Sequence, residues 1–259
     1  MILEFDHVTF RYPGSELPIL ENLSFSLDHK EFVSIIGPSG SGKTTLLRLV
    51  NGFIRPDQGT IRVMDEDLAA DADKNSGTRK KIKCGYMPQN DLLFPWDTLL
   101  DNVALPLRIS KVARAEREEK ARALIEQVGL AGYEDKYPKE LSGGMKQRAS
   151  FARTLATGSD LLLLDEPFSA LDSITRASMQ EWMHRQWRSM NKTILMITHD
   201  VEEAIFLSGR ILVMTGNPVR QMEEVKVPLP EERTRDMVLS GEIMKWKQRL
   251  IGMLREDVG

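Results

Sequence analysis

Short apolar runs recur along the chain and predict strands buried in the core of the protein. Residues 32–36 form one such run, which ends at Gly37. Residues 161–164, 193–198 and 210–215 are three further runs of similar length. Because such runs leave no polar face, they are typical of a parallel sheet that is covered on both sides.

Other patterns predict turns and helices between these runs. Residues 1–36 have the spacing of strands and turns. Helical spacing over residues 44–50 predicts a helix that ends at Asn51 and Gly52. Residues 98–157 are expected to be largely helical, with one apolar stripe made by Ala121, Leu124, Ile125 and Val128.

Two segments stand apart from this core. Residues 65–83 are rich in Asp and Lys, and we expect a mobile surface insertion there. In the tail, residues 226–259, the side chains of Ile243, Leu250 and Leu254 share one helical face. Two interpretations of that face remain open: a helix docked on its own domain, or a regulatory or partner-binding element.

Composition and charge narrow the classes of partner. The net charge is −3 over 259 residues, so the chain has no basic excess and nucleic acid is not expected as a partner. A single cysteine, Cys84, cannot form an internal disulfide and fits a reducing cytosol. We find no signal-peptide pattern and no apolar run of the roughly 18–20 residues that a membrane helix needs. A role at a membrane would require spans from another chain.

A glycine-rich loop after the first buried run carries the clearest chemistry. It matches the G-x-x-x-x-G-K-[ST] pattern of phosphate-binding loops in full. Glycines let backbone N–H groups approach phosphate oxygens, and the following helix presents the positive end of its dipole. We expect Lys43 to reach the β- and γ-phosphates of ATP and the Thr44 hydroxyl to hold Mg²⁺. The expected nucleotide-binding residues here are Gly37, Pro38, Ser39, Gly40, Ser41, Gly42, Lys43, Thr44 and Thr45.

An acidic pair, Asp165 and Glu166, ends the second buried run. Carboxylates at the C-terminal edge of a parallel strand lie where sites form in α/β proteins. Asp165 is expected to bind Mg²⁺, directly or through water, and Glu166 to polarise the attacking water. Together with the phosphate loop, the pair predicts ATP hydrolysis.

A second anion-binding pattern occurs at Ser142, Gly143 and Gly144, before a helical run. A simple helix cap needs Ser and one Gly, so the doubled glycine favours close approach by a ligand. The chain has only one phosphate loop, however. Two half-sites in one chain predict a homodimer in which two copies meet head-to-tail and each closes the other's nucleotide site.

These motifs resemble those of the ATP-binding subunits of ABC transporters, over nearly all of residues 1–225. The signature of that family usually reads Leu-Ser-Gly-Gly-Gln, and Met145 replaces the Gln here. The resemblance implies an α/β fold: a P-loop NTPase core with an N-terminal antiparallel β subdomain and an inserted α-helical subdomain at about 91–157. Residues 1–225 would then form the ABC ATPase domain and 226–259 a C-terminal helical tail.

The same resemblance assigns roles to further residues. Tyr12 matches the aromatic residue that stacks on adenine, and Gln89 the glutamine that contacts Mg²⁺ and couples the helical insert to the core. Residues 169–172 match the loop that links the two nucleotide sites across the dimer. His199 matches the histidine that senses the γ-phosphate, which makes it catalytic together with Glu166 and Lys43. The remaining histidines are expected at surface or packing positions: His7, His29 and His184.

Within the family, residues 87–96, 102–106 and 167–172 resemble the importers of nitrate, sulfonate, taurine and thiamine precursors. This implies separate permease subunits in the membrane, a solute-binding protein that acts through them, and a peripheral position on the cytoplasmic face of the cell membrane. Trp96 lies where such subunits contact the permease; the alternative interpretation is a core aromatic residue.

Two other functions compete with this one. A soluble ABC-type ATPase that acts on ribosomes or DNA usually carries two ATPase halves or long coiled coils, and this chain has one half and no heptad run. A nucleotide-binding scaffold without hydrolysis is disfavoured because Glu166 and His199 are both present.

Overall fold

The computed structural model describes residues 1–68, 84–238 and 240–255, and its centre is a six-stranded sheet. The strand order is β10-β9-β3-β8-β7-β6, parallel from β9 to β6, with β10 antiparallel to β9. The strands are β3 (Phe32–Ile36), β6 (Cys84–Met87), β7 (Leu161–Asp165), β8 (Thr193–Ile197), β9 (Arg210–Met214) and β10 (Met222–Lys226). The four apolar runs therefore form strands, as predicted.

Alternate residues of the central strands belong to two different cores. In β7, Leu162 and Leu164 pack with the helical region, whereas Leu161 and Leu163 pack with the N-terminal strands and helix α1 (Lys43–Val50). Successive side chains of a strand point to opposite faces. Because both faces are covered, every residue of β3, β7 and β8 is buried.

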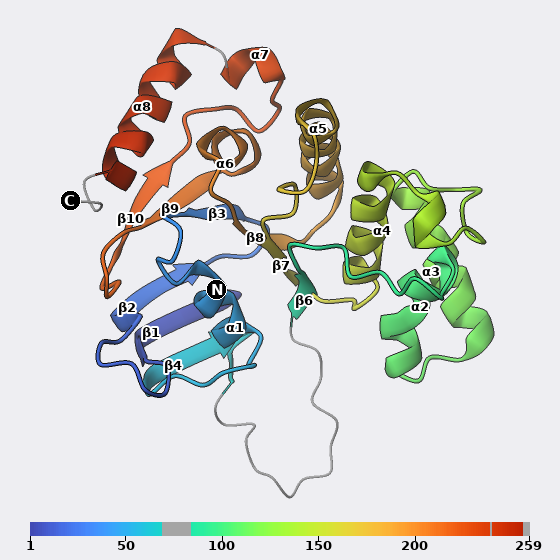
Figure 1. Cartoon of the computed structure of the whole chain (residues 1–259), viewed down its shortest axis with the longest axis horizontal. Helices are drawn as coiled ribbons and strands as arrows, with labels where there is room; N and C mark the ends of the chain where they lie inside the picture. Colours follow the sequence, from blue (N-terminus) through green and yellow to red (C-terminus); the bar gives the residue numbers. More distant parts are fainter. Residues whose placement is uncertain (69–83, 239, 256–259) are drawn as a thin grey trace, which may run out of the picture.

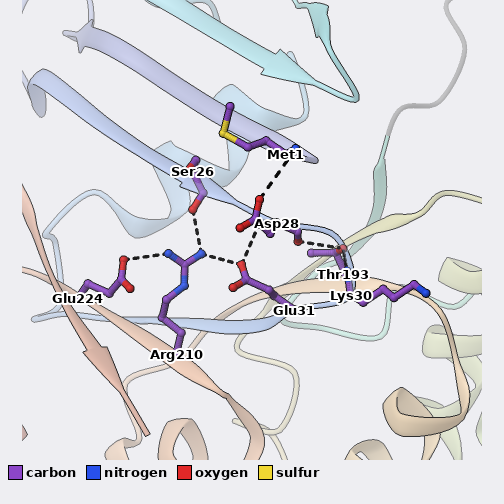
Figure 2. A network of polar contacts seen from close by, with 8 residues as sticks. All are labelled: Met1, Ser26, Asp28, Lys30, Glu31, Thr193, Arg210 and Glu224. Carbon is purple, nitrogen blue, oxygen red and sulfur yellow. Dashed lines mark hydrogen bonds and ion pairs between the residues drawn. The ribbon is translucent and has the colours of Figure 1, made fainter.

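The N-terminal strands form a second, antiparallel sheet with the order β2-β1-β4-β5. They are β1 (Leu3–Phe10), β2 (Leu20–Leu27), β4 (Gln58–Val63) and β5 (Glu66–Asp67). A polar network joins this sheet to the central one (Figure 2). The Arg210 guanidinium donates to the Ser26 carbonyl at 2.9 Å, to Glu31 at 2.7 Å and to Glu224 at 2.9 Å.

Helices α2 (Leu99–Ile109), α3 (Arg114–Gln127) and α4 (Gly143–Leu155) lie to one side of the central sheet, beyond β6 and β7 (Figure 1). A 3-10 turn, η2 (Pro138–Glu140), precedes α4. The predicted helical stretch is thus confirmed. The predicted limits of the subdomains remain predictions.

The tail packs on the same molecule. After β10 come α7 (Arg235–Val238) and α8 (Gly241–Arg255), and α8 lies beside α6 (Val201–Leu207) (Figure 1). Ile243 and Leu250 are buried in a cluster with Val201 and Ile205, and Leu254 packs at its edge. The apolar face predicted in the tail therefore docks on its own domain.

Two further predictions concern the insertion at residues 65–83 and the absence of membrane-spanning helices. Most of the predicted insertion at 65–83 lies outside the described residues, which resume at Cys84. Among the described residues, the structure contains no helix with the length and apolar character needed to cross a membrane.

Candidate functional site

The phosphate loop connects β3 to α1, as the sequence predicted, and its backbone requires glycine at defined positions. Gly40 and Gly42 have positive φ angles of 84° and 95°, a region that glycine adopts without steric cost. A Cβ at Gly37 would lie 2.6 Å from the Met214 carbonyl oxygen. Gly42 is also the N-cap of α1 and offers no side chain to the free N–H groups of the helix, so these groups remain available to an anion.

Lys43 is held inside this loop. Its ammonium donates to the carbonyls of Gly37 at 2.8 Å and Pro38 at 2.7 Å. Burial lowers the pKa of Lys43, and the nearby charges of Glu166 and Asp165 oppose that shift. The Oγ atom of Ser41 is buried without a hydrogen-bond partner in the described part of the chain. A cation and an unsatisfied hydroxyl in one loop fit the oxygens of a bound phosphate.

Asp165 and Glu166 lie at the C-terminal end of β7, where the sequence placed them. Asp165 accepts a hydrogen bond from the Tyr86 hydroxyl at 3.1 Å, and burial raises the pKa of its carboxyl group. Glu166 has a positive φ of 44°, and its N–H donates to the Ile197 carbonyl at 2.9 Å. A non-glycine residue in this conformation stores backbone strain of about 1–3 kcal/mol, which is typical of functional sites.

Two residues expected at the site converge on one carboxylate oxygen of a third. Oε2 of Glu166 lies 3.2 Å from Nδ1 of His199 and accepts a hydrogen bond from Nε2 of Gln89 at 3.2 Å. Gln89 also lies 3.3 Å from the Ser169 hydroxyl. Gln89 and His199 are 110 residues apart in the sequence (199 − 89). The structure therefore brings together a carboxylate, an amide and an imidazole that the sequence motifs placed separately.

Tyr12 is placed beside α1. Its hydroxyl lies 3.2 Å from the Thr45 hydroxyl and accepts from Arg48 at 3.2 Å, while its ring meets Phe10 edge-on. This position next to the phosphate loop is compatible with stacking on a nucleotide base, which remains a prediction. The other histidines lie as expected: His7 and His29 are exposed, and His184 is buried.

Ser142, Gly143 and Gly144 begin helix α4. Ser142 is its N-cap and accepts from the Met145 N–H at 3.3 Å. A Cβ at Gly144 would lie 3.0 Å from Thr175 on helix α5 (Ser173–Ser189), so packing gives a second reason for this glycine. Among the described residues, no hydrogen bond or ion pair joins 142–144 to the phosphate loop.

Sequence reasoning missed two residues of this region. Tyr86 lies on β6 in parallel register with Leu163 of β7, and it reaches Asp165 from there. Glu203 lines a small cavity together with Glu166 and His199. It accepts from Gln180 at 2.8 Å, and burial raises its pKa to about 7. Only the pairing of distant segments reveals either residue.

Trp96 is not a core residue. Its side chain is 70% exposed and stacks on Phe94 with the ring centroids 5.3 Å apart. The interpretation of Trp96 as a core aromatic is therefore wrong. Phe94 is half-buried, and an exposed aromatic ring stacked on such a neighbour is typical of a contact surface.

The site fits a divalent cation that is bound mainly through a nucleotide. No group of three or more His, Cys, Asp or Glu side chains in the described segments could hold a metal ion alone. Mg²⁺ commonly takes one or two protein ligands, with substrate phosphates and water completing its shell. Asp165, buried with a raised pKa, is a carboxylate that a nearby cation would stabilise in its charged form.

Comparison with known proteins agrees with this geometry. Residues 20–169 match the family model described as ABC transporter. The formylaminopyrimidine import ATP-binding protein ThiZ of Halalkalibacterium halodurans is 44% identical over 227 residues, which cover 88% of this chain and 85% of the relative. The taurine import ATP-binding protein TauB of Pseudomonas putida is 40% identical over 226 residues, or 87% and 83% of the two chains.

Solved structures give the same result for the fold. The dimeric post-hydrolysis structure of the ATP-binding cassette MJ0796 bound to ADP and Pi superposes with a TM-score of 0.73 at 31% identity, covering 88% of this chain and all of that one. These comparisons confirm the predicted importer branch, the α/β cassette fold and the ATPase class. The chain belongs to the ABC transporter family.

Proposed function

We propose that this chain is the ATP-hydrolysing subunit of an ABC importer. In this proposal it binds Mg-ATP at a head-to-tail homodimer interface and drives solute uptake through a separate permease at the cytoplasmic face of the membrane. The observation that carries the proposal is the convergence of Gln89 and His199 on Glu166. Glu166 directly follows Asp165, and the charges of both carboxylates act to raise the pKa of Lys43.

ATP binding is assigned to the phosphate loop. The N–H groups of the loop and of the α1 N-terminus would surround the β- and γ-phosphates. Lys43 would exchange its present carbonyl partners, Gly37 and Pro38, for phosphate oxygens. Thr44, Gln89 and Asp165 would hold Mg²⁺, which supplies charge stabilisation to the phosphates when bound.

Hydrolysis is assigned to Glu166. Its carboxylate would accept a proton from the attacking water as a general base. His199 and Gln89, both at 3.2 Å from the same oxygen, orient this carboxylate. We assign His199 to contact with the γ-phosphate, so that the imidazole links the base to the group under attack. The strained φ of Glu166 fits a side chain held in a fixed direction.

The second half of each site is assigned to the other copy. Ser142, Gly143 and Gly144 lie at a helix N-terminus, and among the described residues no hydrogen bond or ion pair joins them to the phosphate loop of their own chain. The MJ0796 cassette is dimeric in its solved structure with ADP and Pi, which supports a dimer here as well. Each signature would then close over the γ-phosphate bound by the partner.

The import role draws on the relatives and on one surface. ThiZ and TauB are named as import ATP-binding proteins for formylaminopyrimidine and taurine, so we propose a thiamine precursor or a solute of the nitrate, sulfonate and taurine type. Trp96 and Leu92 are exposed at the start of the helical region, and we assign them to contact with the permease. A solute-binding protein would act through that permease.

The test is reconstitution in vesicles with candidate permease subunits of this importer branch. We expect the ATPase to sediment with vesicles that contain the permease and to drive ATP-dependent uptake when a solute-binding protein is supplied. Vesicles without the permease are the control. Cosedimentation with ribosomes instead of these vesicles would favour the soluble ATPase and contradict the import role.

A further inference from the structure

A second cavity lies between helix α5, helix α6 and the segment that leads into α7. Its volume is about 280 Å³, and it shares no lining residue with the cavity beside Glu166. Figure 1 shows α6 between α5 and the tail helices. Sites for small molecules usually have volumes of about 300–1,000 Å³, so this cavity suits a small ligand.

The lining of the cavity contains three arginines and two glutamates, and the charge of Glu231 also acts on Arg233. Arg185 and Arg188 come from α5 and Arg233 from the tail, against the two carboxylates of Glu181 and Glu232. Arg185–Glu181 and Arg188–Glu232 are both separated by 3.8 Å, and one partner of each is largely exposed. Such pairs contribute little to stability. An anion entering the cavity can therefore replace the carboxylates at the two guanidinium groups of α5.

Arg233 supplies a positive charge in a fixed position. Its Nη1 donates to the carbonyls of Ile205, Phe206 and Ser208 at 2.8–3.0 Å, and its Nε to the Pro230 carbonyl at 2.8 Å. Burial lowers the pKa of Arg233 to about 10, so the group stays charged at neutral pH. A cation held by four carbonyl contacts needs little reorganisation to meet an anion.

The inner wall is aromatic and includes a polar atom without a partner. His184 is 4% exposed, and its Nε2 lacks a hydrogen-bond partner among the described residues. Its ring centroid lies 5.5 Å from that of Phe206. Burial lowers the pKa of His184 to about 4, and the charges of the three arginines add to that shift. This part of the lining is therefore uncharged and aromatic, with its two rings tilted by 43° to each other.

We propose that this cavity binds a small organic acid. Its carboxylate or sulfonate would pair with Arg185 and Arg188, whose planar guanidinium groups match such oxyanions in bidentate geometry. The apolar part of the acid would lie against the rings of Phe206 and His184. Because the tail contributes Arg233 to the wall, the bound acid would join α5 to the tail.

Calorimetry on the full chain without nucleotide tests the proposal. The probes are benzoate and benzenesulfonate, with benzamide as an uncharged control of similar shape. We expect saturable binding of at least one acid, and the stronger of the two identifies the preferred oxyanion. Arg188→Gln should weaken that binding at least about tenfold, the effect of losing one charged hydrogen bond.

Two further variants keep this test decisive. Arg185→Gln removes the more exposed guanidinium of the pair and should also weaken binding. Arg122→Gln, at an exposed position of α3, should leave the affinity unchanged. Absence of saturable binding by both acids, equal binding of benzamide, or full affinity in both cavity variants would overturn the proposal.

Discussion

Helices α1 and α4 both begin after glycine-rich segments, yet the two segments differ in what they can bind alone. The start of α1 has no side-chain cap and carries a buried lysine, Lys43. The start of α4 is capped by Ser142, and its Gly144 packs near Thr175. The first segment offers unsatisfied N–H groups and a cation. In the second, Ser142 already accepts from the Met145 N–H and no lysine stands beside the free N–H groups, so this segment can close over an anion but is less well equipped to hold one alone.

The largest effect is expected from a change at Glu166, the proposed general base. Glu166→Gln should slow hydrolysis by roughly 10²–10⁴-fold, the range for losing a general base, while ATP binding is kept. Single-turnover phosphate release measures the rate. Glu126→Gln, at an exposed position of α3, is the matched control.

The same variant should also stabilise the dimer, because ATP then stays intact at the interface. Size-exclusion chromatography with Mg-ATP follows this state. A Glu166→Gln protein that remains monomeric while the unaltered chain dimerises would contradict the proposed closure.

Lys43→Ala should weaken ATP binding by about 10–100-fold, because the loop then loses its cation for the phosphates. Calorimetry with Mg-ATP measures the affinity, and Lys120→Ala on α3, whose lysine pairs with Glu116, should have no effect. Wild-type affinity of Lys43→Ala would show that the loop is not the phosphate site.

Mixed dimers distinguish the role of the α1 N-terminus from that of the α4 N-terminus. Ser142→Arg should impair turnover without impairing ATP binding by the monomer, because the arginine would block the partner's site. With Lys43→Ala and Ser142→Arg in different subunits, both lesions fall in one composite site and the other site stays whole. With both changes in one subunit, each site carries one lesion.

Counting occluded ATP in a single turnover distinguishes these mixtures. We expect about one ATP per dimer in the first mixture and markedly less in the second, as the head-to-tail geometry requires. Equal occlusion in the two mixtures would exclude that geometry.

The smallest expected effect is on the free energy of unfolding, through the N-cap of helix α4. Ser142→Ala should lower the free energy of unfolding by about 1 kcal/mol through loss of the N-cap. Ser41→Ala should leave the stability of the nucleotide-free chain nearly unchanged, since its Oγ has no hydrogen-bond partner in the described structure. Urea unfolding measures both; a larger loss for Ser41→Ala would reverse the contrast between the two segments.

Local sequence patterns predict much of the fold and of the candidate site. The strand, loop and helix around Lys43 and the strand ending at Asp165 are each contiguous in sequence, so apolar runs and glycine spacing were enough to predict them. The family motifs then indicated Gln89 and His199, which do lie beside Glu166.

Contacts that depend on tertiary pairing could not be predicted in this way. Tyr86 reaches Asp165 only because β6 pairs with β7. Trp96 is apolar, and its exposure depends on how the helical region packs. Arg210 joins the two sheets through partners at three separate places in the chain (Figure 2). Tyr86 and Arg210 have no local sequence signal, and for Trp96 the sequence left the choice between a contact surface and the core open.

The docked tail bears on how freely this ATPase could be exchanged between transporters. Helix α8 covers Val201 and Ile205 of α6 with Ile243 and Leu250, and α6 begins two residues after His199. A chimera joined at residue 225 would leave this apolar surface of α6 open to water or to a foreign tail that does not fit it. The tail and the catalytic core should therefore be transferred together. A chimera that keeps this interface would include the chain through Arg255.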